Sequence, residues 1–250
     1  MAPLTGTEQL NTDCRALFLE QLSLLEHSLD ILPDKPEETA FSALSTLWHF
    51  ALGNPLSCKA AVEIPLANLP ENAFDLLRGL VIKRINGTPL AYIVGRQNFM
   101  GLELLSGPSA LIPRKETEQL AEVSLGYVKS MMDTQSKVKI IDHFTGSGNL
   151  PLCFADRLPL ASVYGADISE EAIKLARTNA KRLNLPAQFE VGDMFEPFDS
   201  DSFYGTFDLV SGAPPYIIEK NVPNMAEEIS NHEPKLAFEA GPFGFIFLCV

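Results

Sequence analysis

The sequence contains few cysteines and few histidines, and neither type is grouped. Four cysteines in 250 residues form no pair at the Cys-x-x-Cys spacing, which argues against a disulfide framework or a zinc site and favours reduced thiols in a cytoplasm. They are Cys14, Cys58, Cys153 and Cys249. The four histidines show no ligand spacing either, so we expect no metal site. They are His27, His49, His143 and His232.

Basic residues are also scarce, with 19 Lys and Arg against 32 Asp and Glu and a net charge of −13. An acidic chain repels phosphate backbones, which argues against broad electrostatic binding to DNA or RNA. Every apolar run is short and interrupted by charge, so no membrane span is expected. The first residues lack a basic stretch followed by an apolar core, so we predict no secretory signal and a cytoplasmic location.

The first part of the chain has the composition and spacing of a helical bundle. Hydrophobic residues make up 46% of the sequence, which is ordinary for a folded protein and excludes wholesale disorder. Leucines and aromatic residues recur at helical spacing, predicting helices at about residues 13–32 (capped by Asp13), 38–52 and 70–85. We interpret these stripes as core packing. Residues 88–105 alternate apolar residues with Pro and Gly, which predicts a hairpin or an extended linker.

The rest of the chain alternates strand, turn and helix. We expect helices at about 116–132, 150–157 and 169–183, with Ser169 as the cap of the last. We expect strands at 138–142, 162–166, 189–191 and 207–211. This alternation predicts an α/β fold with a parallel sheet and helices on both of its faces.

Polar and small residues follow the predicted strands, where ligands bind in open parallel sheets. The turn at residues 145–148 is Thr-Gly-Ser-Gly, and its glycines let a ligand approach the backbone closely. Asp167 follows the second strand and suits the hydroxyls of a ribose, while Asp193 follows the third and suits the amine of an adenine. Because GxGxxG and the Walker lysine are absent, a nucleoside-type cofactor fits better than a phosphate-type one. Taken singly, these residues also fit a plain loop, a helix cap and a turn.

The fourth predicted strand leads into Ala213, Pro214, Pro215 and Tyr216. Two consecutive prolines fix the backbone and offer no N–H groups, so nearby carbonyls are available to a planar amide or amine. Tyr216 is suited to pack on such a plane. A rigid exit turn is the structural alternative.

Together, these motifs resemble the HemK family of class I S-adenosylmethionine-dependent methyltransferases, which methylate a glutamine in the GGQ loop of peptide chain release factors. The resemblance covers nearly all residues from about 13 to 250, and two of its segments are not general methyltransferase features. Those two are Gly-Thr-Pro-Leu-Ala-Tyr-Ile-Val-Gly at 87–95 and Leu-Ile-Pro-Arg-Lys-Glu-Thr-Glu at 111–118. The others lie at 142–148, 167, 192–193, 214–216 and 232–234.

The resemblance implies a Rossmann-like sheet preceded by a small helical domain and a hairpin linker. It implies a substrate-recognition domain at 1–86, a linker at 87–112 and a methyltransferase domain at 113–250. The implied partner is a release factor, methylated by in-line displacement with no metal and with no single catalytic residue identified. The implied cofactor-binding residues are Phe144, Thr145, Gly146, Ser147, Gly148, Asp167, Asp193, Met194 and Ala213. The implied substrate-binding residues are Ala213, Pro214, Pro215 and Tyr216.

The sequence departs from the family pattern at two residues of the implied site. Ala213 replaces an Asn whose side-chain oxygen holds the substrate amide, and a lost hydrogen bond of this kind costs about 1–3 kcal/mol. Phe144 replaces a small residue beside the methionine part of the cofactor. The family also continues beyond residues 242–244 with a helix and a final strand pair, so we expect a sheet that lacks its last strands.

These departures favour a second hypothesis, a catalytically inactive relative that acts as a binding scaffold. A third hypothesis is a methyltransferase for another amine or for nucleic acid, against which the negative charge argues.

Overall fold

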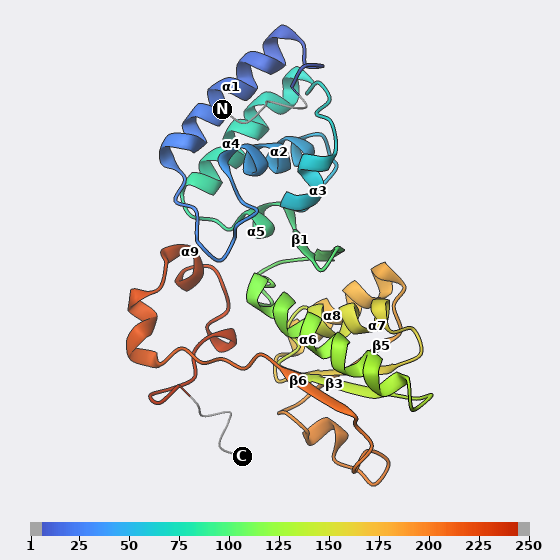
Figure 1. Ribbon diagram of the computed structural model, residues 1–250. Coiled ribbons are helices and arrows are strands. Elements are labelled where there is room, and N and C mark those ends of the chain that lie inside the picture. Colours follow the sequence, from blue (N-terminus) through green and yellow to red (C-terminus); the bar gives the residue numbers. More distant parts are fainter. Residues whose placement is uncertain (1–6, 245–250) are drawn as a thin grey trace. The chain divides into compact units, whose positions relative to one another are not determined.

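The computed structural model describes residues 7–244, which fall into two compact units divided between Asn98 and Phe99 (Figure 1). The division lies inside the predicted linker 87–112. Three of the cysteines are buried free thiols, and Cys249 lies outside the described residues. The predicted early end of the sheet domain also falls on residues outside this range.

The first unit is a helical bundle in which the three predicted helices are present. Its helices are α1 (Thr12–Ser28), α2 (Ala40–Ala51), α3 (Cys58–Glu63), α4 (Phe74–Ile85) and α5 (Leu90–Val94), with a 3-10 turn at Glu71–Ala73. The predicted cap Asp13 is wrong, because the side chain of Asn11 accepts the N–H of Cys14 instead. The same helix ends at Ser28, before the predicted residue 32.

The core of this unit surrounds the fully buried side chains of Phe18 and Trp48, whose rings meet edge to face with centroids 5.5 Å apart. The indole N–H of Trp48 donates to the carbonyl of Ala67 at 2.8 Å. The interior also holds an ion pair between Arg84 and Glu38, at 2.9 Å. The apolar stripes read from the sequence are therefore core.

The second unit contains a four-stranded parallel sheet in the order β5-β4-β3-β6. Its strands are β3 (Lys139–His143), β4 (Ser162–Asp167), β5 (Ala187–Val191) and β6 (Leu209–Gly212). Its long helices are α6 (Lys115–Met132), α7 (Asn149–Arg157) and α8 (Glu170–Leu183). The side chain of Ser169 caps α8 as predicted, accepting the N–H of Ala172. The predicted Rossmann-like fold is therefore present.

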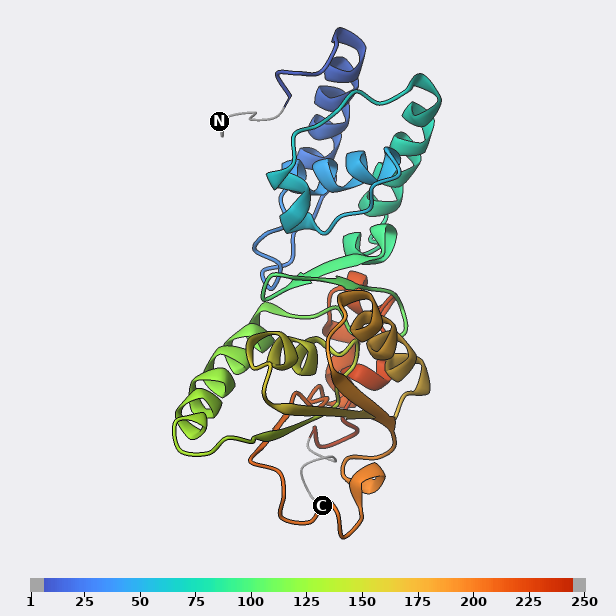
Figure 2. The same cartoon turned by 90° about the vertical axis from the view of Figure 1, so that its right-hand side faces the viewer.

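Helices cover one face of this sheet (Figure 2). The side chains of Ile140, Val163 and Phe189 share a core with α6, α7 and α8. On the opposite face, Ile141 and Tyr164 pack against aromatic rings from residues 198–207. The prediction of helices on both faces is wrong for the described residues, because the β5–β6 connection forms only a 3-10 turn (Glu196–Phe198) and fills the space with aromatic rings.

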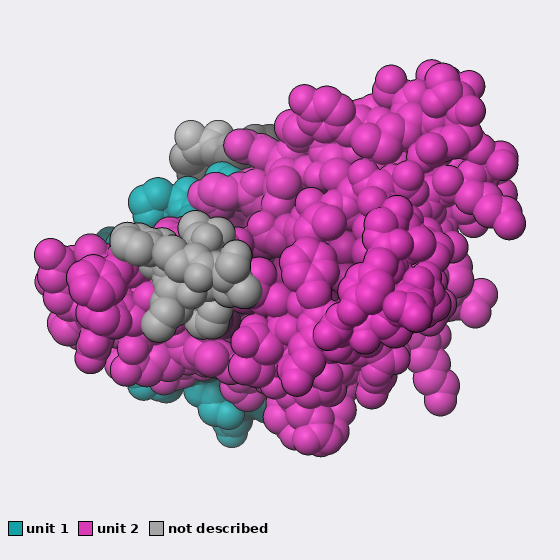
Figure 3. Space-filling view, turned by 90° about the horizontal axis from the view of Figure 1, so that it is seen from below, with its two compact units in different colours: residues 1–98 teal, residues 99–250 magenta. Residues whose placement is uncertain are grey.

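The predicted hairpin consists of β1 (Arg96–Phe99) and β2 (Leu102–Leu105), and the division between the two units falls within it. Figure 3 shows the two units in different colours. Its turn residues Met100 and Gly101 both have positive φ angles, 52° and 91°. Two such residues form the tight turn that matches the twist of paired strands.

The segment after β6 folds back on itself. The N–H of Ile217 donates to the carbonyl of Phe238 at 2.9 Å, and the carbonyl of Ile217 accepts the N–H of Ala240 at 2.8 Å. Between these residues lie α9 (Glu227–Ser230) and 3-10 turns at Glu219–Asn224 and Lys235–Ala237. Across residues 7–244, no helix is both long and apolar enough to span a membrane.

Candidate functional site

A pocket lies at the carboxyl end of the parallel sheet, where the strand-end motifs were predicted to meet. Residues after all four strands line it, together with the segment before α6 and the segment 234–237. The predicted site residues that line it are Phe144, Gly146, Asp167, Asp193, Met194, Ala213 and Pro215. Further lining residues include Ala110, Ile112, Arg114, Thr117, Asp142, Leu150 and Ala172. The described residues contain no cluster of side chains suited to a metal.

The glycine turn is held by backbone hydrogen bonds and by close packing. The N–H of Thr145 donates to the carbonyl of Ala166 at 3.0 Å. At Gly148, φ is 83° and a Cβ atom would lie 3.1 Å from both Ala176 and Phe189, so only glycine fits without a shift. Glycine at 148 is therefore required by the packing of the turn against α8 and β5, and Gly148 is not among the lining residues of the pocket.

The buried amide of Asn179 fixes the same turn, a role the sequence reasoning missed. Its Nδ2 donates to the carbonyls of Ser147 at 3.0 Å and Leu105 at 3.2 Å, and its Oδ1 accepts the N–H of Leu105 at 2.7 Å. Asn179 is fully buried. A polar residue on the apolar face of a predicted helix was the available signal.

The carboxylate of Asp167 holds the backbone around it and still has acceptor positions for a ligand. Its Oδ2 accepts the N–H of Gly146 at 2.8 Å, and its Oδ1 accepts the N–H of Ser169 at 2.9 Å. Burial raises the pKa of this carboxyl, and the two N–H donors oppose that rise. A carboxylate has about four acceptor positions, so both oxygens retain capacity for ligand hydroxyls.

Asp142 lies beneath the pocket, and sequence reasoning gave it no separate role. Its Oδ1 accepts the hydroxyl of Ser211 at 2.8 Å, which joins the ends of β3 and β6. Burial raises its pKa to about 7, partly opposed by this hydrogen bond. A carboxylate that ends a buried strand was the signal in the sequence.

The predicted adenine-side residues lie in an exposed loop after β5. Asp193 is exposed, and Met194 has a left-handed backbone with φ of 45°. The next residue, Phe195, packs edge-on against the ring of His143 with centroids 4.2 Å apart. The pKa of His143 is lowered by burial.

Phe144 follows β3 with φ of 61°, in the region that disfavours side chains. It lines the pocket beside the end of β6, where a Cβ atom on Gly212 would lie 3.5 Å from its Cδ2 atom. The ring is therefore at the site and is not turned into the core.

The substrate-side motif is divided by the structure. Ala213 and Pro215 line the pocket, whereas Pro214 does not, and Tyr216 is 74% exposed outside the lining. Tyr216 thus does not line the pocket, and its contact with a substrate amide stays a prediction.

A buried ion pair joins two walls of the pocket. Glu233 accepts the N–H of Ile112 at 2.9 Å and the guanidinium of Arg114, and its own side chain has no exposed area. These residues belong to two motifs quoted for the resemblance, although the sequence assigned them no role.

Comparison with known proteins agrees with this geometry. A family model described as a methyltransferase domain matches residues 134–235. The release factor glutamine methyltransferase of Chlorobaculum tepidum is 33% identical over 228 residues, covering 90% of this chain and 76% of that protein. The same-named protein of Aliivibrio fischeri is 37% identical over 167 residues (66% and 56%), and that of Vibrio cholerae is 39% identical over 166 residues (66% and 55%).

The matched regions thus span little more than half the length of the Aliivibrio and Vibrio proteins. The match to the Chlorobaculum protein is longer and covers nine-tenths of this chain and three-quarters of that protein. This chain therefore belongs to the HemK family of class I methyltransferases, whose members are named release factor glutamine methyltransferases.

Proposed function

We propose that this protein transfers a methyl group from S-adenosylmethionine to the side-chain amide nitrogen of a glutamine in a peptide chain release factor. The observation that carries the proposal is the similarity over 228 residues to a protein with that named activity. The pocket at the sheet edge supports it, because Asp167, Ala213 and Pro215 all line it.

The pocket suits the nucleoside part of this cofactor. Asp167 offers free acceptor positions toward a ribose diol, and Asp193 offers a carboxylate toward an adenine amine. Many residues of the pocket lining are apolar, as a purine ring requires. These apolar residues include Ala110, Ile112, Leu150, Ile168 and Ala172. When bound, S-adenosylmethionine supplies an electrophilic methyl group on a sulfonium sulfur.

The turn at residues 213–216 is the proposed site for the glutamine amide. Pro214 and Pro215 carry no N–H, so this backbone presents acceptors to the two N–H bonds of an amide. Ala213 offers no side-chain acceptor, so orientation of the amide depends on the backbone alone. An amide nitrogen is a poor nucleophile, and positioning can contribute about 7–11 kcal/mol to such a transfer.

We also propose that the helical residues 1–86 recognise the release factor. This assignment follows the family resemblance of the N-terminal region. Its measurable consequence is an effect of substitutions at exposed residues of α1 and α4 on the KM for the release factor, with unchanged cofactor affinity. Leu24, Leu76 and Ile82 are suitable positions, with 41–53% exposed side chains.

The test combines calorimetry with intact-mass measurement of a purified release factor. We expect cofactor binding and the addition of one methyl group, which is absent when the acceptor glutamine is replaced by glutamate. No binding of any adenine nucleoside would refute the assignment of the pocket. Binding of both cofactor and release factor without methylation would instead support the scaffold hypothesis, which the side chain of Ala213 favours.

A further inference from the structure

The position of Phe144 is fixed by the order of the strands. β3 lies between β4 and β6, and its last residue His143 pairs with Ala166 on one side and Gly212 on the other. Phe144 therefore leaves the sheet between the end that carries Asp167 and the end that leads to Ala213. Given the proposed function, this is the interval between the ribose and the methyl acceptor.

The side chain of Phe144 lies where it can limit the size of a ligand group in that interval. The ring of His143, the last residue of β3, packs against Phe195. Phe144 lines the pocket and approaches the side-chain-free edge of Gly212. Its backbone is left-handed, with φ of 61°, a conformation that glycine adopts more readily than a residue with a bulky ring.

The charges around the pocket give an independent reason to consider the amino-acid arm of the cofactor. That arm carries a carboxylate and an ammonium group, and burying a charge requires a partner. Arg114 is the one basic side chain among the described lining residues, and Glu233 already binds it. Asp142, Asp167 and Asp193 also line the pocket, so the lining offers acceptors for the ammonium group of the arm but adds only negative charge around its carboxylate.

We propose that Phe144 is a specificity-determining residue that makes the pocket favour a purine thionucleoside without an amino-acid arm over one that carries it. The inference rests on the proposed nucleoside pocket and concerns the ligand's 5′ substituent. Phe144 lines the pocket beside Gly212, the residue before Ala213, and the basic side chain of the lining, Arg114, is already paired with Glu233.

Two neutral thioethers make a matched pair of probes. S-adenosylhomocysteine and 5′-deoxy-5′-methylthioadenosine share the nucleoside and the sulfur, and they differ in whether the sulfur carries the amino-acid arm or a methyl group. Calorimetric titration of the full chain is expected to give a Kd for methylthioadenosine about tenfold lower than that for S-adenosylhomocysteine, since forcing a ligand into an overfilled site is costly.

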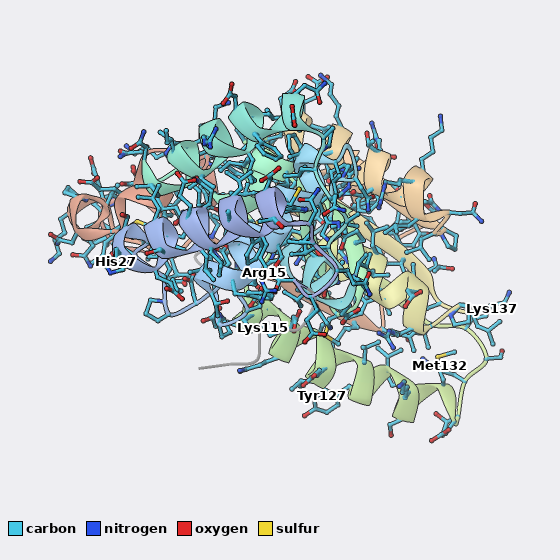
Figure 4. The ribbon with its side chains drawn as sticks, turned by 90° about the horizontal axis from the view of Figure 1, so that it is seen from above. Arg15, His27, Lys115, Tyr127, Met132 and Lys137 are labelled. Carbon is cyan, nitrogen blue, oxygen red and sulfur yellow. The ribbon has the colours of Figure 1, made fainter. Side chains whose placement is uncertain are left out.

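Two variants separate the ring from the backbone. Phe144→Ala removes the ring but keeps a side chain in the left-handed conformation, whereas Phe144→Gly also relieves the backbone. Both are expected to tighten S-adenosylhomocysteine about tenfold and to change methylthioadenosine by less than about threefold. Tyr127→Ala is the aromatic control, because Tyr127 is 64% exposed on α6 and points away from the helix in Figure 4. It should change neither affinity.

The outcomes distinguish this inference from the proposed function. Equal or tighter binding of S-adenosylhomocysteine by the unaltered protein, or no tightening in either folded variant, would overturn the role of Phe144 and leave the nucleoside pocket intact. Failure of both probes to bind the unaltered protein and both variants would overturn the pocket assignment itself, and this inference with it. Thermal melts establish that each variant is folded.

Discussion

The ion pair between Arg114 and Glu233 gives a prediction whose size follows from burial. The side chain of Glu233 has no exposed area and that of Arg114 has 13%. Arg114→Met removes the guanidinium and leaves a buried carboxylate whose remaining identified donor is the N–H of Ile112. Removing one member of a buried pair costs about 3–5 kcal/mol. At about 2–4 °C per kcal/mol for a unit of this size, we expect the melting temperature of the second unit to fall by roughly 6–20 °C.

The assay can tell the two units apart. The single tryptophan, Trp48, is buried in the first unit, so its fluorescence follows that unit, while circular dichroism follows the helices of both. We expect Arg114→Met to shift the circular dichroism transition in urea with a smaller shift in Trp48 fluorescence. Lys174→Met removes the exposed ion pairs of Lys174 with Glu170 and Glu171 on α8 and is expected to leave both unfolding transitions nearly unchanged.

A double-mutant cycle completes the test. Glu233→Gln keeps an oxygen for the N–H of Ile112 but removes the charge, so adding it to Arg114→Met should recover part of the lost stability. The expected coupling is about 1 kcal/mol or more. A loss below about 1 kcal/mol in Arg114→Met, or strictly additive losses in the double variant, would refute the reasoning that this pair is a buried clamp.

Three further changes are predicted. Burial raises the pKa of Asp142 from an ordinary value near 4 to about 7. Between these two pH values the folded state binds more protons than the unfolded state, so the free energy of unfolding should decline from about pH 4 to pH 7. Asp142→Asn should flatten this decline in urea titrations, and an unchanged slope would contradict the prediction. Asn179→Ala leaves the N–H of Leu105 and the carbonyl of Ser147 without the side-chain amide and should lower the free energy of unfolding by roughly 2–5 kcal/mol. An unchanged free energy of unfolding would contradict this and show that water replaces the amide. Ala213→Asn supplies a side-chain acceptor and should raise kcat for release-factor methylation by about tenfold or more, with little change in cofactor Kd; an unchanged kcat would show that this acceptor is not limiting.

The sheet and its binding edge could be predicted because they depend on local patterns. Strands alternating with helices imply parallel pairing, and the carboxyl ends of parallel strands meet at one edge. Asp167 and the turn containing Gly146 were placed together by this rule, and the N–H of Gly146 does donate to Asp167. The helices α3 and α5, of six and five residues, were missed because each is shorter than the window in which helical periodicity is visible.

The supporting contacts of the site could not be predicted, because their partners are far apart in the chain. Ser211 and Asp142 are separated by 69 residues, and Glu233 and Arg114 by 119. No periodicity in a single sequence reports such pairs. The same limit explains the error about the sheet's second face, where a 3-10 turn and a group of phenylalanines replace the expected helices.

Three carboxylates at or beside the pocket also hold the fold together. Asp142, Asp167 and Glu233 each accept hydrogen bonds that hold strand ends or pocket walls together. Replacing any of them removes a contact of the fold as well as a group facing the pocket, so lost activity in such a variant does not identify a ligand contact. Phe144 and Ala213 differ, because their replacement alters the shape or acceptors of the pocket without removing a carboxylate that holds the backbone. Gains in affinity or turnover at these two neutral positions are therefore the clearest measure of what the pocket binds and whether it transfers a methyl group.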